Sequence, residues 1–266
     1  MLKRTLTGAG LVAVCVGFFL LRNLVDARLF CILIGIFCVL GTYELMRALG
    51  DRAACMPYVM VYAVAIVPTY VLGGIAAAAI VFALFAVSFV LLFALDRTFK
   101  ARQLGLTLFA MVYPSFFLVA MAAVNQLGEN GYFALLLIFL VSPAADTFAY
   151  LVGSLLKGPK LCPKLSPNKT ISGAIGGLVG GVAAALALYF ILMPALNVPL
   201  PAFFVAMIGL VAAVFTECGD LFESFIKRRL EIKDMGKILP GHGGIMDRID
   251  GMLFASAFLC FVFALL

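Results

Sequence analysis

Acidic and basic side chains are concentrated near the end of this chain, where they could bind a metal ion and phosphate groups. More than half of its 13 Asp and Glu residues lie between positions 217 and 250, among many of its Lys and Arg residues. Two of these acids, Asp220 and Asp247, are predicted to come from different helices, and magnesium prefers carboxylate oxygens. Carboxylates flanked by cations are the parts required for metal-assisted transfer of a phosphorus group.

The first part of this stretch is predicted to continue a membrane-spanning helix. Glu217, Asp220, Ser224 and Lys227 are spaced by three or four residues, so they line one helix face, and Glu223 lies one turn before Lys227. Glu217 and Asp220 directly follow an apolar run, which places them near the membrane interface, where uncompensated acids are costly. The alternative is a solvated helix end with internal ion pairs.

A glycine-rich turn follows, with the sequence Pro-Gly-His-Gly-Gly at 240–244. It cannot be regular helix, and its glycines allow backbone amides to surround an anion. Asp247, Arg248 and Asp250 then open the last helix, where carboxylates favour the N-terminal dipole and offer oxygen ligands to magnesium. The alternative is a simple re-entry loop, with His242 as a structural histidine.

The composition indicates whether the helices that carry these residues lie in water or in a membrane. The chain is 65% hydrophobic and 12% charged, with a mean hydropathy of +1.18, so it is predicted to be an integral membrane protein. The absence of Trp, the single His and the lack of a basic tail argue against nucleic-acid binding despite the net charge of +6. The seven cysteines form no CxxC pair, so we expect neither a disulfide framework nor a structural zinc.

The predicted fold is all-α and polytopic, with about nine transmembrane helices and cytoplasmic catalytic loops. The predicted spans are 5–21, 28–47, 57–73, 75–95, 103–124, 132–153, 172–193, 201–221 and 249–266. We expect a single membrane domain, in which residues 1–130 are an N-terminal scaffold and residues 131–266 form the catalytic part. The sequence shows no convincing internal repeat of the kind found in transporters.

The basic residues predict the orientation of these helices. With a cytoplasmic N-terminus, all 19 Lys and Arg residues except Arg22 and Arg28 fall in cytoplasmic segments. The segments 154–171 and 222–248 are the longest of these, so the predicted active site faces the cytoplasm.

The charged stretch resembles a known motif. Ser224-Phe-Ile-Lys227-Arg228, Lys233-Asp234-Met-Gly236 and the run from Leu239 to Asp250 closely resemble the C-terminal motif of phosphatidate cytidylyltransferases, also called CDP-diacylglycerol synthases. The resemblance extends to the blocks 146–150 and 166–173. In the second block this chain has Ile171 and Ser172 where the family often has an aromatic and an acidic residue.

The resemblance implies an enzyme of phospholipid biosynthesis in a bacterial inner membrane of plasma-membrane type. It would join CTP and phosphatidate, a bilayer lipid, to give CDP-diacylglycerol and pyrophosphate, with Mg²⁺ and room for a second cation. It also implies a homodimer, which the close helix approach allowed by Gly176-Gly177 and Gly180-Gly181 would suit. A CTP-dependent lipid kinase is the alternative of similar chemistry, and a cation-coupled secondary transporter is the alternative of another class.

Under this resemblance each candidate residue receives a role. Asp220 and Asp247 are expected to bind metal, with Glu223 and Asp250 as outer candidates. The expected catalytic residues are Asp220, Asp247, Lys227 and Arg248. The residues expected at the substrates are Asp146, Lys169, Thr170, Ser172, Ser224, Arg228, Lys233, Gly241, His242, Gly243 and Gly244. Asp146 is expected within the cytoplasmic half of the bilayer, and a loop at 166–170 is expected to deliver Lys169 and Thr170 to the next helix N-terminus.

Overall fold

Long apolar helices dominate the structure, a computed structural model that describes the chain except residues 1, 54–55, 73–78, 81–82, 89, 91–93, 95–99 and 193–199. Within the described residues, seven helices are long and apolar enough to cross a membrane, and a shorter apolar helical stretch covers Val59–Leu72. The predicted class, a polytopic integral membrane protein, is confirmed.

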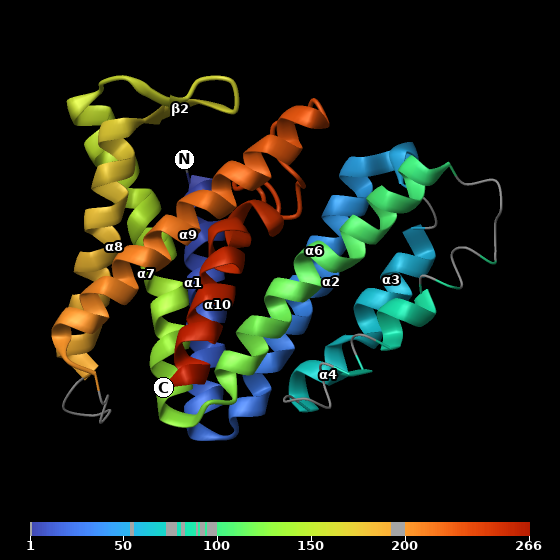
Figure 1. The fold of residues 1–266 in the computed structure, drawn as a ribbon, viewed down its shortest axis with the longest axis horizontal. Coiled ribbons are helices and arrows are strands. Elements are labelled where there is room, and N and C mark those ends of the chain that lie inside the picture. Colours follow the sequence, from blue (N-terminus) through green and yellow to red (C-terminus); the bar gives the residue numbers. More distant parts are fainter. Residues whose placement is uncertain are drawn as a thin grey trace. The chain divides into compact units, whose positions relative to one another are not determined.

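The elements follow the predicted spans closely (Figure 1). Helices and strands are α1 (Leu2–Leu24), α2 (Phe30–Leu49), α3 (Met56–Ala65), α4 (Val67–Leu72), α6 (Ala101–Asn125), α7 (Gly128–Leu156), β1 (Lys160–Cys162), β2 (Ser166–Thr170), α8 (Ile171–Leu192), α9 (Ala202–Arg229) and α10 (Met246–Leu265). Short 3₁₀ turns, Ala27–Leu29 and Gly50–Arg52, flank α2.

Two of the nine predicted spans need comment. The third, 57–73, is not one helix, because α3 ends at Ala65 and α4 begins at Val67. Pro68 has no amide hydrogen to donate to the preceding turn, which explains the break. The fourth predicted span, 75–95, lies largely outside the described residues.

The chain folds into two compact units. The first comprises Met1–Gln126 and Leu230–Arg248, and the second comprises Leu127–Arg229 and Ile249–Leu266. In the first unit α2 packs against α1, α3, α4 and α6. The side chains of Phe30, Ile34 and Leu45 on α2 are fully buried, as expected of a helix that is apolar on all sides.

In the second unit α8 packs against α7 and α9, and its glycines allow this close approach. A Cβ atom at Gly176 would lie 2.5 Å from the side chain of Val152, and one at Gly180 would lie 2.5 Å from that of Phe148. Both partners belong to α7 of the same chain. These glycines therefore serve packing within one protomer, and the expected homodimer rests on the family resemblance alone.

The segment between α7 and α8 differs from the expected loop. Strands β1 and β2 pair antiparallel, with Lys160 opposite Thr170 and Cys162 opposite Ser166. The expected loop at 166–170 is thus strand β2, which lies in the yellow-green part of Figure 1. The hairpin connects the end of α7 to the start of α8, and it leads Lys169 and Thr170 to the N-terminus of α8.

Candidate active site

The glycine-rich turn lies in the segment between α9 and α10, within the first unit. The amide of Leu239 donates to the carbonyl of Gly243 at 2.9 Å, and the amide of His242 donates back to the carbonyl of Leu239 at 2.9 Å. Gly241 and Gly243 have φ angles of 79° and 85°, which residues with a side chain rarely adopt. The prediction that this stretch is not helical is confirmed.

A basic cavity of about 690 Å³ opens at this turn, within the size range of ligand pockets. Three cationic side chains, Lys233, Lys237 and Arg248, line it, together with His242 and a single acid, Asp234. The other lining residues are Gly236, Leu239, Pro240, Gly241 and Gly243. The excess of positive charge suits an anionic ligand such as a polyphosphate.

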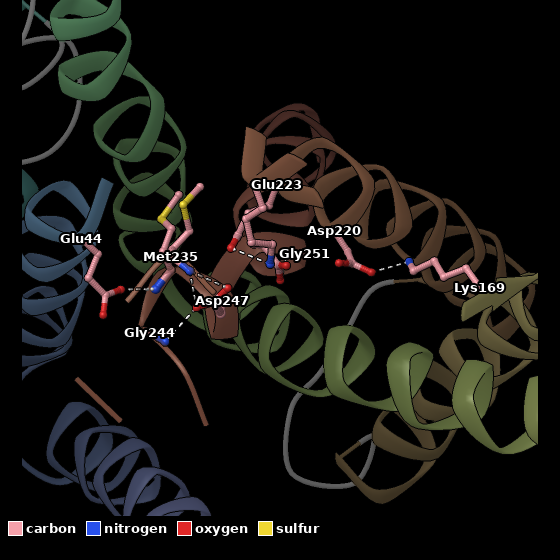
Figure 2. A network of polar contacts seen from close by, with 11 residues as sticks. Glu44, Lys169, Asp220, Glu223, Met235, Gly244, Asp247 and Gly251 are labelled. Carbon is pink, nitrogen blue, oxygen red and sulfur yellow. Dashed lines mark hydrogen bonds and ion pairs between the residues drawn. The ribbon is translucent and has the colours of Figure 1, made fainter. Parts of the chain in front are cut away.

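Asp247 lies in the first turn of α10 and faces two backbone amides (Figure 2). Its Oδ2 atom accepts a hydrogen bond from the amide of Gly244 at 2.8 Å and one from that of Met235 at 3.0 Å. The amide of Gly244, expected to bind phosphate, is therefore directed at a carboxylate. These bonds hold the Asp247 carboxylate in a fixed position beside the turn.

Glu44 on α2 is a second acid at this turn, and it was not among the residues predicted from the sequence. Its side chain is buried, and its Oε2 atom accepts a hydrogen bond from the amide of Met246 at 2.9 Å (Figure 2). The sequence feature that could have identified Glu44 is an acid inside the apolar span predicted at 28–47, and the same feature singled out Asp146.

In the second unit, Lys169 of strand β2 connects two acids of α9. Its Nζ atom lies 2.5 Å from Oε2 of Glu217 and 2.5 Å from Oδ2 of Asp220, and Figure 2 shows the Lys169 side chain extended toward Asp220. Burial alone would lower the pKa of Lys169, but the charges of Asp220 and Glu217 outweigh it and raise the pKa above the ordinary value. Lys169 is thus a firmly protonated cation.

Further along α9, Lys227 pairs with Glu223 at 3.1 Å, one helical turn apart. Glu223 is fully buried. The buried carboxylate of Asp250, on α10, accepts a hydrogen bond from the amide of Gly251 at 2.7 Å. Asp146, Asp220 and Lys227 lie close enough to Asp250 to interact with it electrostatically. Helices α7, α9 and α10 therefore bring acids together within the second unit.

The hairpin residues make local contacts around the start of α8. The hydroxyl oxygen of Thr170 accepts a hydrogen bond from the amide of Gly173 at 3.0 Å, which is an N-cap interaction. The hydroxyl of Ser172 donates to the carbonyl of Lys157. From α9, Nε of Arg228 donates to the carbonyl of Leu165 at 3.1 Å, so α9 also supports the hairpin.

A family profile described as the cytidylyltransferase family matches residues 2–266. The chain belongs to this family. The match covers both units, so the family expected from the C-terminal motif is confirmed over nearly the whole chain.

Individual relatives carry a more specific name. A phosphatidate cytidylyltransferase of Bacillus subtilis (strain 168) is 34% identical over 185 residues, which is 69% of this chain and 67% of that protein. One of Brucella abortus (strain 2308) is 32% identical over 150 residues, 56% of this chain and 53% of that protein. One of Helicobacter pylori is 61% identical over 54 residues, 20% of this chain and 19% of that protein.

The expected site residues of this cytidylyltransferase fall into two groups. The first unit holds Lys233, Gly241, His242, Gly243 and Arg248 around the cavity, with Gly244 in the glycine-rich turn and Asp247 in the first turn of α10. The second unit holds Asp146, Lys169, Thr170, Ser172, Asp220, Glu223, Ser224, Lys227, Arg228 and Asp250. Lys237 and Asp234 line the cavity although neither was selected from the sequence.

No cluster of three or more His, Cys, Asp or Glu side chains suited to a metal ion occurs among the residues that the structure describes. Asp220 and Asp247 belong to different units, so their joint metal site stays a prediction.

Proposed function

We propose that this cytidylyltransferase is a phosphatidate cytidylyltransferase, which converts CTP and phosphatidate into CDP-diacylglycerol and pyrophosphate. The observation that carries the proposal is the basic cavity at the glycine-rich turn, beside the fixed carboxylate of Asp247. The name shared by the relatives supports the same reaction. The cavity supplies positive charge to balance the phosphates of a nucleoside triphosphate, and the apolar helices supply a surface for a lipid substrate.

In the proposed reaction an oxygen of the phosphatidate phosphate attacks the α-phosphorus of CTP. A new P–O–P bond forms, the bond between the α-phosphorus and the bridging oxygen to the β-phosphate breaks, and pyrophosphate leaves with that electron pair. The attacking phosphate is already an anion near neutral pH, so no strong general base is required. Catalysis rests on positioning and on neutralising charge.

The residues of the cavity fit the phosphate chain of CTP. Lys233, Lys237 and Arg248 would neutralise its charge, and the turn at Gly241 and Gly243 leaves room for a phosphate to approach the backbone. In the second unit, we assign Lys227 and Arg228 to the phosphates, and Ser224 and Asp146 to positions around the substrates. Lys169, Thr170 and Ser172 are assigned to the N-terminus of α8, which suits an anion.

We assign Asp220 and Asp247 as metal ligands, with Glu223 and Asp250 as outer candidates. The chemistry of the donors fits Mg²⁺, because carboxylate oxygens are hard ligands. Asp247 accepts bonds from amides of Met235 and Gly244, which orient its oxygens, and Asp220 has its Oδ2 atom against Lys169. Bound magnesium, and a second cation where one binds, would neutralise phosphate charge and polarise the α-phosphorus.

We further propose that the N-terminus and the segments 154–171 and 222–248 face the cytoplasm, where CTP is present. The excess of Lys and Arg in these segments supports this orientation. Phosphatidate would enter from the side, because its acyl chains gain from staying among lipid tails while its headgroup reaches the interface.

Incubation of the purified protein in detergent with CTP, phosphatidate and Mg²⁺ tests the reaction. Two CTP samples are compared, one labelled at the α-phosphorus and one at the γ-phosphorus. The expected result is label in the lipid product from α-labelled CTP and label in pyrophosphate from γ-labelled CTP. Label from the γ-position in the lipid would instead identify a CTP-dependent lipid kinase, and unlabelled lipid in both samples would refute nucleotide chemistry on phosphatidate.

A further inference from the structure

The N-terminus of α10 is capped by a residue from a distant part of the chain. Met246 is the first residue of α10, and Ile245 before it has an apolar side chain that cannot accept a hydrogen bond. The first amides of a helix have no partner within the helix and need an acceptor. Oε2 of Glu44 is the acceptor for the amide of Met246, at 2.9 Å, and the amides of Ile245 and Ile238 lie near the same carboxylate.

The glycines of the turn segment leave the space that Glu44 occupies. A Cβ atom at Gly236 would lie 2.0 Å from Oε1 of Glu44, and one at Gly244 would lie 2.4 Å from Oε2. Real Cβ atoms do not approach other atoms this closely, so a side chain at either position would displace the carboxylate. Gly236 and Gly244 therefore form a cradle for Glu44.

The same segment that holds Glu44 also holds the candidate catalytic groups. Gly244 donates its amide to Asp247, so it touches Glu44 on one side and Asp247 on the other. Gly236 and Arg248 both line the basic cavity. A displacement of Glu44 would thus be transmitted to Asp247 and to the cavity through one or two residues.

An acid within an apolar helix is costly unless the protein compensates it. Helix α2 is apolar and largely buried, and its packing alone gives no reason for a carboxylate at position 44. The hydrogen bond from the amide of Met246 and the positive end of the α10 dipole offset part of this cost. Among the residues that the structure describes, Glu44 forms no ion pair with Lys or Arg, and its carboxylate is oriented instead by the start of α10.

We propose that Glu44 is a positioning residue of the active site: its carboxylate fixes the segment 236–246 and the first turn of α10, and thereby sets the position of Asp247 and the shape of the basic cavity. This inference rests on the proposed function where it concerns CTP. Its structural part, the ordering of the segment, holds independently of which nucleotide reaction the protein catalyses.

The test compares Glu44→Gln with Thr42→Val as a matched control. Gln keeps the size of Glu but replaces one acceptor oxygen with a donor, which cannot accept bonds from the surrounding amides. Thr42 is equally buried on the same helix, and its hydroxyl bonds within that helix to Cys38. Both variants lose a buried polar interaction, but only the first touches the turn segment.

Two readouts separate positioning from general stability. Hydrogen exchange of peptides covering 230–248, measured by mass spectrometry, reports the order of the segment. The affinity for CTP and its KM report the cavity. For Glu44→Gln we expect exchange in this segment and KM for CTP to rise about tenfold, as loss of a hydrogen bond to a charged group predicts. For Thr42→Val we expect wild-type values of both.

The inference is overturned if Glu44→Gln gives the same hydrogen exchange as Thr42→Val, because Glu44 then does not order the segment. It is also overturned if the two variants have the same KM for CTP, because Glu44 then does not shape the cavity. If Glu44→Gln does not fold, Glu44→Asp takes its place with the same criteria, since Asp keeps the charge but is one methylene too short to reach Met246. A wild-type protein that makes no CDP-lipid refutes the proposed function instead, and exchange and CTP affinity then decide the role of Glu44.

Discussion

Replacing Lys169 with Met tests whether strand β2 is fixed to α9 by charge. Met is close to Lys in length but carries no charge, so Glu217 and Asp220 would be left without the cation that lies between them. Removing one partner of a buried ion pair costs about 3–5 kcal/mol. The side chains of Lys169, Glu217 and Asp220 are 20%, 10% and 27% exposed, and this exposure reduces the expected loss to about 2–3 kcal/mol.

The assay is thermal unfolding of the detergent-solubilised protein in EDTA, at one fixed scan rate. At about 2–4 °C per kcal/mol for a chain of this size, Lys169→Met should unfold roughly 5–10 °C below the wild type. Lys164→Met, exposed between β1 and β2, is the matched control and should unfold at the wild-type temperature. Equal unfolding temperatures for the two variants would refute the reasoning.

The pH dependence of this difference follows from the raised pKa of Lys169. A group whose pKa is higher in the folded state stabilises that state fully below its unfolded pKa, which for Lys is 10.5. The gap between wild type and Lys169→Met should therefore be constant from pH 7 to 9 and should shrink only above about pH 10.5. A gap that already closes by pH 9 would show that the ammonium is not held by the two acids.

Three further predictions concern the site, the topology and the assembly. Asp220→Asn and Asp247→Asn should each lower turnover by on the order of a hundredfold or more in folded protein, and near-normal turnover with unchanged magnesium dependence in both would rule out a shared metal site. A cysteine introduced at Lys160 in sealed, right-side-out vesicles should resist an impermeant thiol reagent, and labelling from outside would contradict the orientation. Light scattering of the active protein should give the mass of a dimer, and a monomeric mass would contradict that expectation.

Hydropathy predicted most of the helices because the membrane imposes a simple constraint on them. An apolar stretch of sufficient length has few alternatives to a helix, since its backbone amides must be satisfied internally. The third predicted span, 57–73, is an apolar helical stretch, and hydropathy does not register the short interruption before Pro68 that separates α3 from α4. Likewise, the polar segment 160–170 carries no hydropathy signal, so the β1–β2 hairpin was missed.

The residues of the turn were predictable as a group, but their partners were not. Glycine content and charge predicted a turn that could face an anion, and the structure has a basic cavity there. The partner on α2 lies 202 positions earlier in the chain, and no local pattern connects Glu44 to Met246. The pairing of Lys169 with Glu217 and Asp220 is equally non-local.

Two kinds of partner hold the carboxylates of Glu44, Asp247 and Asp220, and the difference bears on metal binding. Glu44 and Asp247 accept hydrogen bonds from backbone amides of one segment, so the positions of both carboxylates follow that segment. Asp220 is held by the side chain of Lys169, so a cation at that oxygen must compete with an ammonium group. Metal binding at Asp220 is therefore coupled to the position of Lys169 and, through strand β2, to the start of α8.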